Sequence, residues 1–190
     1  AIRLSEVPET QLSDPVKKAR KAALEEYRNV NLYVSDFPGG RYNIGIMYAN
    51  SGDLEKAAES YRAALKIYNL CYMAKVNLAT VYNLQGKNDE AEKLLREVIS
   101  ENPQIHDVYY SLALLLAEKG NIPESRKLFL KAAELMPEQP RIVYNLALVE
   151  NSQGNTALAE EYLLSALSKE PDNYDFLYAI CTFYLEHKQN

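Results

Sequence analysis

Cysteine and histidine are scarce in this sequence, which holds only two of each among its 190 residues. Neither Cys71 nor Cys181 begins the Cys-x-x-Cys-His motif through which haem is covalently attached. His106 and His187 lie far apart in the chain, and no further ligand stands at the spacing of a zinc site. We therefore expect the chain to bind neither haem nor metal and to need no cofactor.

Long apolar runs and catalytic combinations of side chains are also missing. No stretch reaches the roughly 18 to 20 apolar residues that cross a bilayer, and residues 1–15 hold no apolar run like that of a signal peptide. The seven glycines form no phosphate-binding loop, and no serine or cysteine is placed to pair with a histidine. These absences predict a protein that is not an enzyme and has no membrane partner.

The chain has no excess of positive charge. Its 21 Lys and Arg residues are outnumbered by 26 Asp and Glu residues, and the basic residues do not gather on one face. The resulting net negative charge repels a phosphate backbone, so nucleic acid is not an expected partner. In residues 132–190 three basic side chains stand against nine carboxylates, so we expect a ligand of this region to be neutral or basic.

What the sequence does contain is a repeat with a fixed step of 34 residues. The residues that mark it are Gly52, Gly86, Gly120 and Gly154, together with Pro103, Pro137 and Pro171. With glycine at position 15, the complete units are 38–71, 72–105, 106–139 and 140–173, and a partial unit starts at 174. Positions 8, 20 and 27 hold small residues in almost every unit, while positions 7 and 24 hold large apolar ones.

Each unit is predicted to be a helix, a short turn and a second helix. Apolar residues recur at helical spacing on both sides of the glycine. Glycine can adopt positive φ and end the first helix, and the residue after it, Asp53, Asn121 or Asn155, can cap the second. Proline at position 32 then stops the second helix, because it has no backbone N–H to donate.

This unit resembles the tetratricopeptide repeat family, and the resemblance covers residues 38–187. It implies an all-α, right-handed superhelical solenoid of antiparallel helix pairs in residues 38–190. Residues 1–37 would form an N-terminal segment with a capping helix at about 15–33. An apolar stripe that includes Val16, Ala19 and Ala23 marks this helix, and Ala23, Tyr27 and Val30 extend columns 20, 24 and 27 backward.

Three columns contain residues that need an explanation. Position 4 is Arg41 and Lys75 in the first two units, which predicts looser packing there. Position 11 is Glu150 where tyrosine stands in three other units, so Glu150 is expected to be either a solvated edge residue or a polar group in the groove. Cys181 at position 8 is expected to be a small buried residue. It lies too far from Cys71 for a disulfide, so both should be free thiols.

In the tetratricopeptide repeat family, successive first helices line a concave face through positions 2, 5, 6, 9, 12 and 13. Here position 5 is mostly tyrosine and position 6 mostly asparagine. The predicted groove residues are Tyr42, Asn43, Asn77, Tyr110, Tyr144, Asn145 and Tyr178. Tyrosine offers flat apolar area and asparagine can both donate to and accept from a peptide backbone. The alternative is that these are consensus residues that merely solvate the groove.

Two alternative functions are expected. The first is a non-enzymatic protein–protein interaction scaffold that binds a peptide or a neighbouring domain in its concave groove. Residues 23–65 and 76–99 also resemble the C-terminal repeat region of bacterial multihaem c-type cytochromes. That resemblance implies an accessory domain of a redox protein, periplasmic or exported, with its haem-binding part N-terminal to this piece. If the cytochrome resemblance does not hold, we expect the protein to be cytoplasmic. The start at Ala1 rather than Met agrees with a piece of a longer protein.

The partial fifth unit stops near position 17, so its helix, about 174–187, has no second helix to cover it. We expect this helix to present Leu177, Ile180 and Tyr184 to a partner. Uncovered apolar faces of this kind usually mark interaction sites. Self-association through this terminal helix is one expected outcome.

Overall fold

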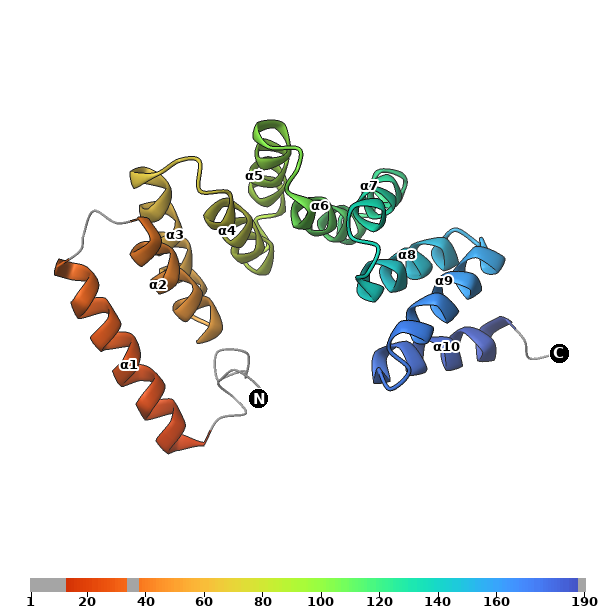
Figure 1. Cartoon of the computed structure of the whole chain (residues 1–190), viewed down its shortest axis with the longest axis horizontal. Helices are drawn as coiled ribbons and strands as arrows, with labels where there is room; N and C mark the ends of the chain where they lie inside the picture. Colours follow the sequence, from red (N-terminus) through yellow and green to blue (C-terminus); the bar gives the residue numbers. More distant parts are fainter. Residues whose placement is uncertain (1–12, 34–37, 188–190) are drawn as a thin grey trace. The chain divides into compact units, whose positions relative to one another are not determined.

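The computed structural model describes residues 13–33 and 38–187, and this part of the chain consists of ten α-helices (Figure 1). The helices pack as sequential antiparallel pairs, which confirms the predicted all-α class. The chain divides into two compact units, the first ending at Val98 and the second beginning at Ile99.

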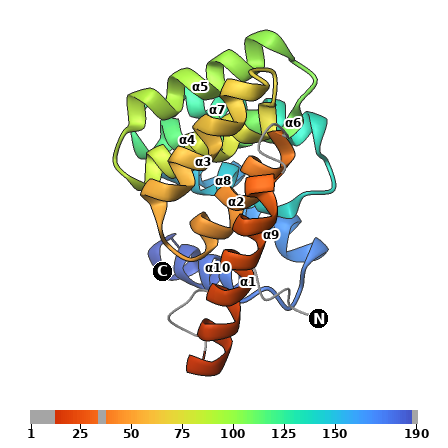
Figure 2. The ribbon, with the colours of Figure 1, turned by 90° about the vertical axis from the view of Figure 1, so that its left-hand side faces the viewer.

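The first unit contains α1 (Asp14–Tyr33), α2 (Pro38–Asn50), α3 (Leu54–Ile67), α4 (Tyr72–Leu84) and α5 (Asn88–Glu101), whose last residues belong to the second unit. Helix α1 lies alongside α2 (Figures 1 and 2). Helix α2 pairs with α3, and α4 packs against α3. The core of this unit includes Ile44, Tyr61 and Leu78, all of which are buried.

The second unit contains α6 (His106–Glu118), α7 (Ile122–Leu135), α8 (Pro140–Ser152), α9 (Thr156–Lys169) and α10 (Tyr174–His187). Helices α6 and α7 form one antiparallel pair, α8 and α9 form the next, and α10 packs against α9. Leu163 of α9 lies in a buried cluster with Ile180 and Phe183 of α10, so the last helix is anchored by its own apolar side chains.

The predicted glycine turns are confirmed. Gly52 has φ +82°, its amide donates to the carbonyl of Ala49 at 3.0 Å, and the amide of Asp53 donates to the carbonyl of Tyr48 at 3.0 Å. This pair of hydrogen bonds is the Schellman motif, which satisfies the last carbonyls of a helix. The other three repeat glycines also have positive φ. A Cβ on any of the four would meet nothing within 4 Å, so backbone conformation is what requires glycine there.

The caps of the second helices match the prediction only in part. Asp53 Oδ1 accepts a hydrogen bond of 3.2 Å from the Lys56 amide, and the Lys56 side chain lowers the pKa of Asp53. Asn121 and Asn155 also stand at N-cap positions, but neither side chain caps its helix. Asn121 Nδ2 donates to Glu124 at 2.9 Å, and the prediction of a side-chain cap was wrong at both asparagines.

The prolines at position 32 lie where the sequence predicts. Helices α5, α7 and α9 each end two residues before one, at Glu101, Leu135 and Lys169. The connection from α3 to α4 has no proline, and Asn69 stands at the equivalent position.

Small residues at position 8 allow the two helices of a repeat to approach closely. A Cβ on Gly45 of α2 would lie 2.4 Å from a ring carbon of Tyr61 on α3. In the third repeat Ser125 Oγ donates to the carbonyl of Ala113 at 2.7 Å, which joins position 20 to position 8 directly. Such contacts leave no room for a larger side chain in either column.

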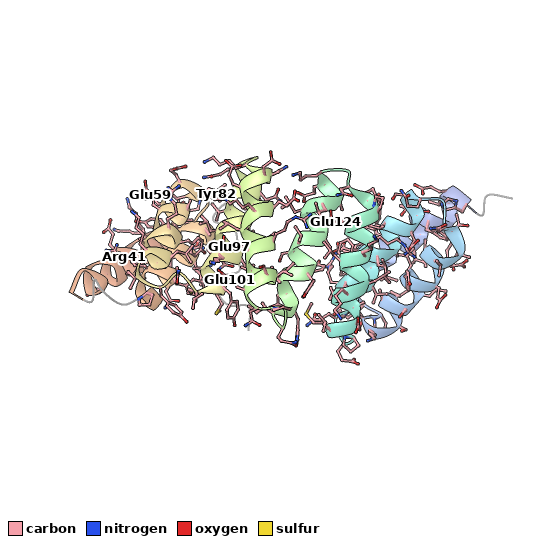
Figure 3. The ribbon with its side chains drawn as sticks, turned by 90° about the horizontal axis from the view of Figure 1, so that it is seen from above. Arg41, Glu59, Tyr82, Glu97, Glu101 and Glu124 are labelled. Carbon is pink, nitrogen blue, oxygen red and sulfur yellow. The ribbon has the colours of Figure 1, made fainter. Side chains whose placement is uncertain are left out.

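The prediction of loose packing at position 4 was wrong for Lys75. This side chain is 4% exposed, and its ammonium lies 2.7 Å from Glu97 Oε1 on α5 (Figure 3). The carboxylate compensates the buried charge, and the aliphatic stem of the lysine can fill space that an aromatic ring would occupy.

Both predictions for Glu150 were wrong as well. The residue is 0% exposed, and its carboxylate accepts hydrogen bonds from Arg126 Nε at 2.6 Å and from Asn155 Nδ2 at 2.7 Å. A buried carboxylate is tolerated when both charge and hydrogen bonding are satisfied, and two partners supply that here. Glu150 therefore ties α8 to α7 and to the start of α9.

Helix α1 forms over the predicted range, but its apolar stripe is only partly covered. Val16 is half-buried, whereas Ala19 and Ala23 are exposed. The side chains of Tyr27 and Val30 lie outside the described residues.

The terminal helix corrects two further expectations. Both cysteines are free thiols, as predicted, but Cys181 is exposed rather than buried. In complete repeats position 8 is covered by the second helix of the same repeat, and no helix follows α10 among the described residues. Ile180 is 6% exposed and packs against α9, so it is not part of an uncovered face. Leu177 is 37% exposed, and the half-buried Tyr184 donates to Glu160 at 2.8 Å.

Candidate functional site

Four of the seven predicted groove residues bind one another. In the first unit Asn77 Nδ2 of α4 donates to Tyr42 Oη of α2 at 3.2 Å, and the rings of Tyr42 and Tyr61 lie 6.0 Å apart. Burial raises the pKa of the Tyr42 phenol, and the hydrogen bond with Asn77 opposes that shift. The pair joins position 5 of one repeat to position 6 of the next.

The same pair recurs in the second unit. Asn145 Nδ2 of α8 donates to Tyr110 Oη of α6 at 2.8 Å, and the Tyr110 ring meets Phe129 edge-on at 5.9 Å. Burial raises the pKa of Tyr110, while Arg141 and the hydrogen bond with Asn145 lower it. These residues therefore hold successive first helices together, which is a structural role that the sequence analysis did not predict.

Tyr144 continues the tyrosine column but has no asparagine to pair with, because position 6 of the fifth unit is Ala179. Its ring lies 5.0 Å from that of Phe176. The Arg141 guanidinium lies 5.4 Å from the Tyr144 ring and 5.1 Å from the Phe176 ring, and its Nη2 is 2.8 Å from Asp175 Oδ2. Arg141 thus combines cation–π contacts with an ion pair and links α8 to α10.

The remaining predicted residues are accessible. Tyr178 on α10 is 73% exposed, and Asn43 on α2 is exposed as well. Two leucines at groove positions 9 and 12 of the second unit also reach the surface, Leu148 at 44% and Leu185 at 61%. We call Arg141, Tyr144, Leu148, Tyr178 and Leu185 the α8–α10 face.

Contacts along both helices hold the α8–α10 face in a fixed register. Arg141 meets Asp175 near the start of the helices, and a ring nitrogen of His187 lies 2.8 Å from Asn151 Oδ1 near their ends. Asp175 and Glu186 stand at positions 2 and 13 of the fifth unit, which belong to the same set of predicted groove columns as the exposed side chains. The face therefore combines accessible apolar area with negative charge.

One exposed apolar segment of the first unit was not predicted from the sequence. It lies at the connection between α3 and α4, where the other repeats carry proline. Its exposed large side chains are Ile67, Tyr68, Leu70, Tyr72 and Met73, each 42–54% exposed. The absence of proline at this connection was the signal that could have singled it out.

Among residues 13–33 and 38–187, no three side chains of His, Cys, Asp or Glu are grouped so that they could hold a metal ion. Within the same ranges, no helix has the length and apolar character needed to cross a membrane.

Comparison with known families agrees with the repeat geometry. A model of the tetratricopeptide repeat matches residues 76–140 and 110–176, and a second model of the same repeat matches residues 38–71. The chain belongs to the tetratricopeptide repeat family. Proteins of this family are generally non-enzymatic scaffolds for protein–protein interaction.

Similar proteins extend this result. The photosystem I assembly protein Ycf3 of Rippkaea orientalis is 36% identical over 69 residues, a stretch that is 36% of this chain and 36% of that protein. The match thus covers only about a third of that relative's length. A crystal structure of MamA superposes with a TM-score of 0.71 at 21% identity, covering 84% of this chain and 96% of that one. For PilF of Pseudomonas aeruginosa the TM-score is 0.72 at 21% identity, with 90% and 72% covered. These two likenesses concern the fold alone.

Proposed function

We propose that this tetratricopeptide repeat protein is a non-enzymatic scaffold that binds a peptide or a neighbouring protein domain on the α8–α10 face. The observation that carries the proposal is the exposure of Tyr178 and Leu148 on neighbouring first helices. These side chains offer apolar area that no other described element covers. Tyrosine also brings a hydroxyl at its tip, and tyrosines of this kind are common anchors in protein interfaces.

The ligand is neutral or basic. The carboxylates of Asp175 and Glu186 flank the exposed side chains, and the cation within the face, Arg141, is already paired with Asp175. Because Arg141 offsets Asp175, Glu186 leaves a net negative charge beside the face, which opposes an acidic ligand and favours a basic one. Assembly is the activity named for the Ycf3 relative, and a scaffold that gathers partners fits that kind of role.

The Tyr110–Asn145 pair contributes to this surface mainly by fixing the spacing of α6 and α8. Replacing Tyr110 by Ala would remove a hydrogen bond and a ring contact inside the fold, so it would not test binding cleanly. Tyr178 and Leu148 are better test positions, because both are exposed and removing them leaves the core unchanged.

The test uses a phage-displayed library of random peptides as the probe. Peptides selected on the chain should be neutral or basic, and the Tyr178→Ala/Leu148→Ala variant should bind them at least about tenfold more weakly, as expected for a pair of interface anchors. Leu164→Ala is the matched control, because Leu164 is 47% exposed on α9 and lies off the face. Equal binding by the double variant, or selection of acidic peptides, would contradict the proposal.

A further inference from the structure

The first and last helices of the described chain each correspond to half of a repeat. Helix α10 spans Tyr174–His187, which are positions 1 to 14, and no helix follows it among the described residues. Helix α1 ends at Tyr33, which lies 34 residues before the end of α3 at Ile67. Among the described residues, α1 therefore has the register of a second helix with no first helix before it, and α10 has that of a first helix with no second helix after it.

In complete repeats the two helices meet through position 8 of the first helix and position 20 of the second. All four residues at position 20 are fully buried: Ala57, Ala91, Ser125 and Ala159 are each 0% exposed. Position 8 is equally enclosed, with Ala113 and Ala147 at 0%. The hydrogen bond of 2.7 Å from Ser125 Oγ to the Ala113 carbonyl shows that the two columns are in direct contact.

In the two half repeats these same columns are exposed. Cys181 stands at position 8 of α10 and Ala23 at position 20 of α1, and both are accessible. Position 4 behaves in the same way, since Leu177 is 37% exposed whereas Tyr109 at the equivalent place is 9% exposed. Helix α10 thus exposes the surface that a second helix covers in a complete repeat, and α1 has the register of such a second helix.

The charges of the two ends are complementary. Helix α1 carries five basic and three acidic residues, and Lys18 and Lys21 are exposed on it. Helix α10 carries Asp175 and Glu186 and no lysine or arginine. Attraction between these ends favours their encounter and weakens as salt screens it.

We propose that α1 of one copy of this chain packs onto α10 of a second copy and completes a repeat between them, with Ala23 against Cys181. The contact uses a different surface on each partner, so it is heterologous and can add further copies in the same direction. It involves positions 4, 8 and 11 of α10, whereas the α8–α10 face uses positions 5 and 12. Self-assembly is therefore separate from the proposed peptide binding. If self-assembly fails, the proposal of peptide binding is not affected.

Two variants, each blocking one end, test this arrangement. Cys181→Trp places a large ring in the column that must be small, and Ala23→Arg does the same on α1. Both positions are exposed, so each variant should fold, which circular dichroism verifies. Ala22→Arg is the matched control, since Ala22 is also exposed on α1 but lies at position 19, where Lys56 and Glu90 are exposed in complete repeats.

Light scattering coupled to gel filtration then gives the mass of each species. The unmodified chain and Ala22→Arg should assemble with rising concentration, and each blocked variant alone should stay monomeric. An equimolar mixture of the two blocked variants should form one-to-one dimers and nothing larger, because it contains a single intact pair of ends. A monomeric unmodified chain, or a mixture without dimers, would overturn the proposal. Continued assembly of Ala23→Arg alone would show α10 pairing with α10, which also overturns it.

Discussion

Asn145 and Tyr110, which lie 35 residues apart in the chain, are joined by a hydrogen bond of 2.8 Å from the amide Nδ2 to the phenolic oxygen. Asn77 and Tyr42 form the same pair with the same separation. Each bond connects the first helices of two successive repeats. Residues that the sequence places on a binding surface therefore also set the spacing of that surface.

Loss of this bond should lower stability by a modest and measurable amount. Asn145→Ala and Tyr110→Phe should each reduce the free energy of unfolding by about 0.5–1.5 kcal/mol, the usual net contribution of one hydrogen bond. The double variant should lose less than the sum of the two, because both remove the same interaction. Urea denaturation of the four proteins gives the coupling directly. Strict additivity would show that the hydrogen bond makes no contribution.

Alkaline pH should destabilise the fold through tyrosines that are half-buried, Tyr42 and Tyr110, or buried, Tyr61. Burial raises the pKa values of Tyr42, Tyr61 and Tyr110 above the ordinary value of 10.0. The native state therefore holds these protons more tightly than the unfolded chain does. Their stabilising contribution is complete below about pH 10 and is lost as the pH rises through the native pKa values.

The measurement is the free energy of unfolding across the alkaline range, with the Tyr42→Phe/Tyr110→Phe variant as the comparison. Phenylalanine cannot ionise, so the variant should lose stability less steeply above about pH 10. Identical pH profiles for the two proteins would remove these tyrosines from the explanation.

Gly45 should not tolerate even a single methyl group. Its added Cβ would lie 2.4 Å from the buried ring of Tyr61, and overpacking of this kind costs about 1–3 kcal/mol. That cost should exceed the gain of roughly 1 kcal/mol from replacing glycine by alanine in a helix. The second and fourth repeats pair alanine with leucine at these positions. Gly45→Ala/Tyr61→Leu should accordingly be more stable than Gly45→Ala, and thermal melts compare them. A Gly45→Ala variant at least as stable as the original would contradict the packing.

Removing Arg126 should be among the most harmful single changes in the second unit. Arg126→Ala leaves the carboxylate of Glu150 fully buried with Asn155 as its remaining partner, and loss of one member of such a pair costs about 3–5 kcal/mol. Arg126→Met/Glu150→Leu should recover most of the loss, since leucine already stands at position 11 in the third repeat. Urea midpoints rank the variants. An Arg126→Ala protein within about 1 kcal/mol of the original would show that the ion pair is dispensable.

The 34-residue register was enough to predict the helices and their ends. Glycine at position 15 and proline at position 32 act on the backbone locally, so their effect can be read from the sequence, and both columns lie where they were expected. The side-chain caps at Asn121 and Asn155 did not form, and these side chains are oriented instead so that Nδ2 donates to Glu124 and Glu150. That choice depends on tertiary neighbours.

The site was less predictable, for reasons that particular residues make clear. The tyrosine and asparagine columns were identified, but their pairing runs diagonally from position 5 of one repeat to position 6 of the next. A separation of 35 residues was the signal for it. Glu150 pairs with Arg126, which stands in a different column of the repeat, so the sequence did not show the pairing. The charge of Glu150 alone therefore predicted an exposed position. Cys181 was expected to be buried by analogy with its column, and that analogy fails because no helix among the described residues covers α10 on this side.

If a single register governs both the interior of the repeats and the contact between their ends, residues 23 and 181 of two copies must lie together. Disulfide formation between Ala23→Cys in one copy and Cys181 in another tests it most directly. One partner carries Ala23→Cys, Cys71→Ser and Cys181→Ser, and the other carries Cys71→Ser alone, so each holds one thiol. Ala22→Cys in the first background is the control. After mild oxidation, the Ala23→Cys partner should form a disulfide-linked mixed dimer with the partner that holds Cys181. The Ala22→Cys control should form little or none. Equal cross-linking at the two positions, or none at either, would contradict it.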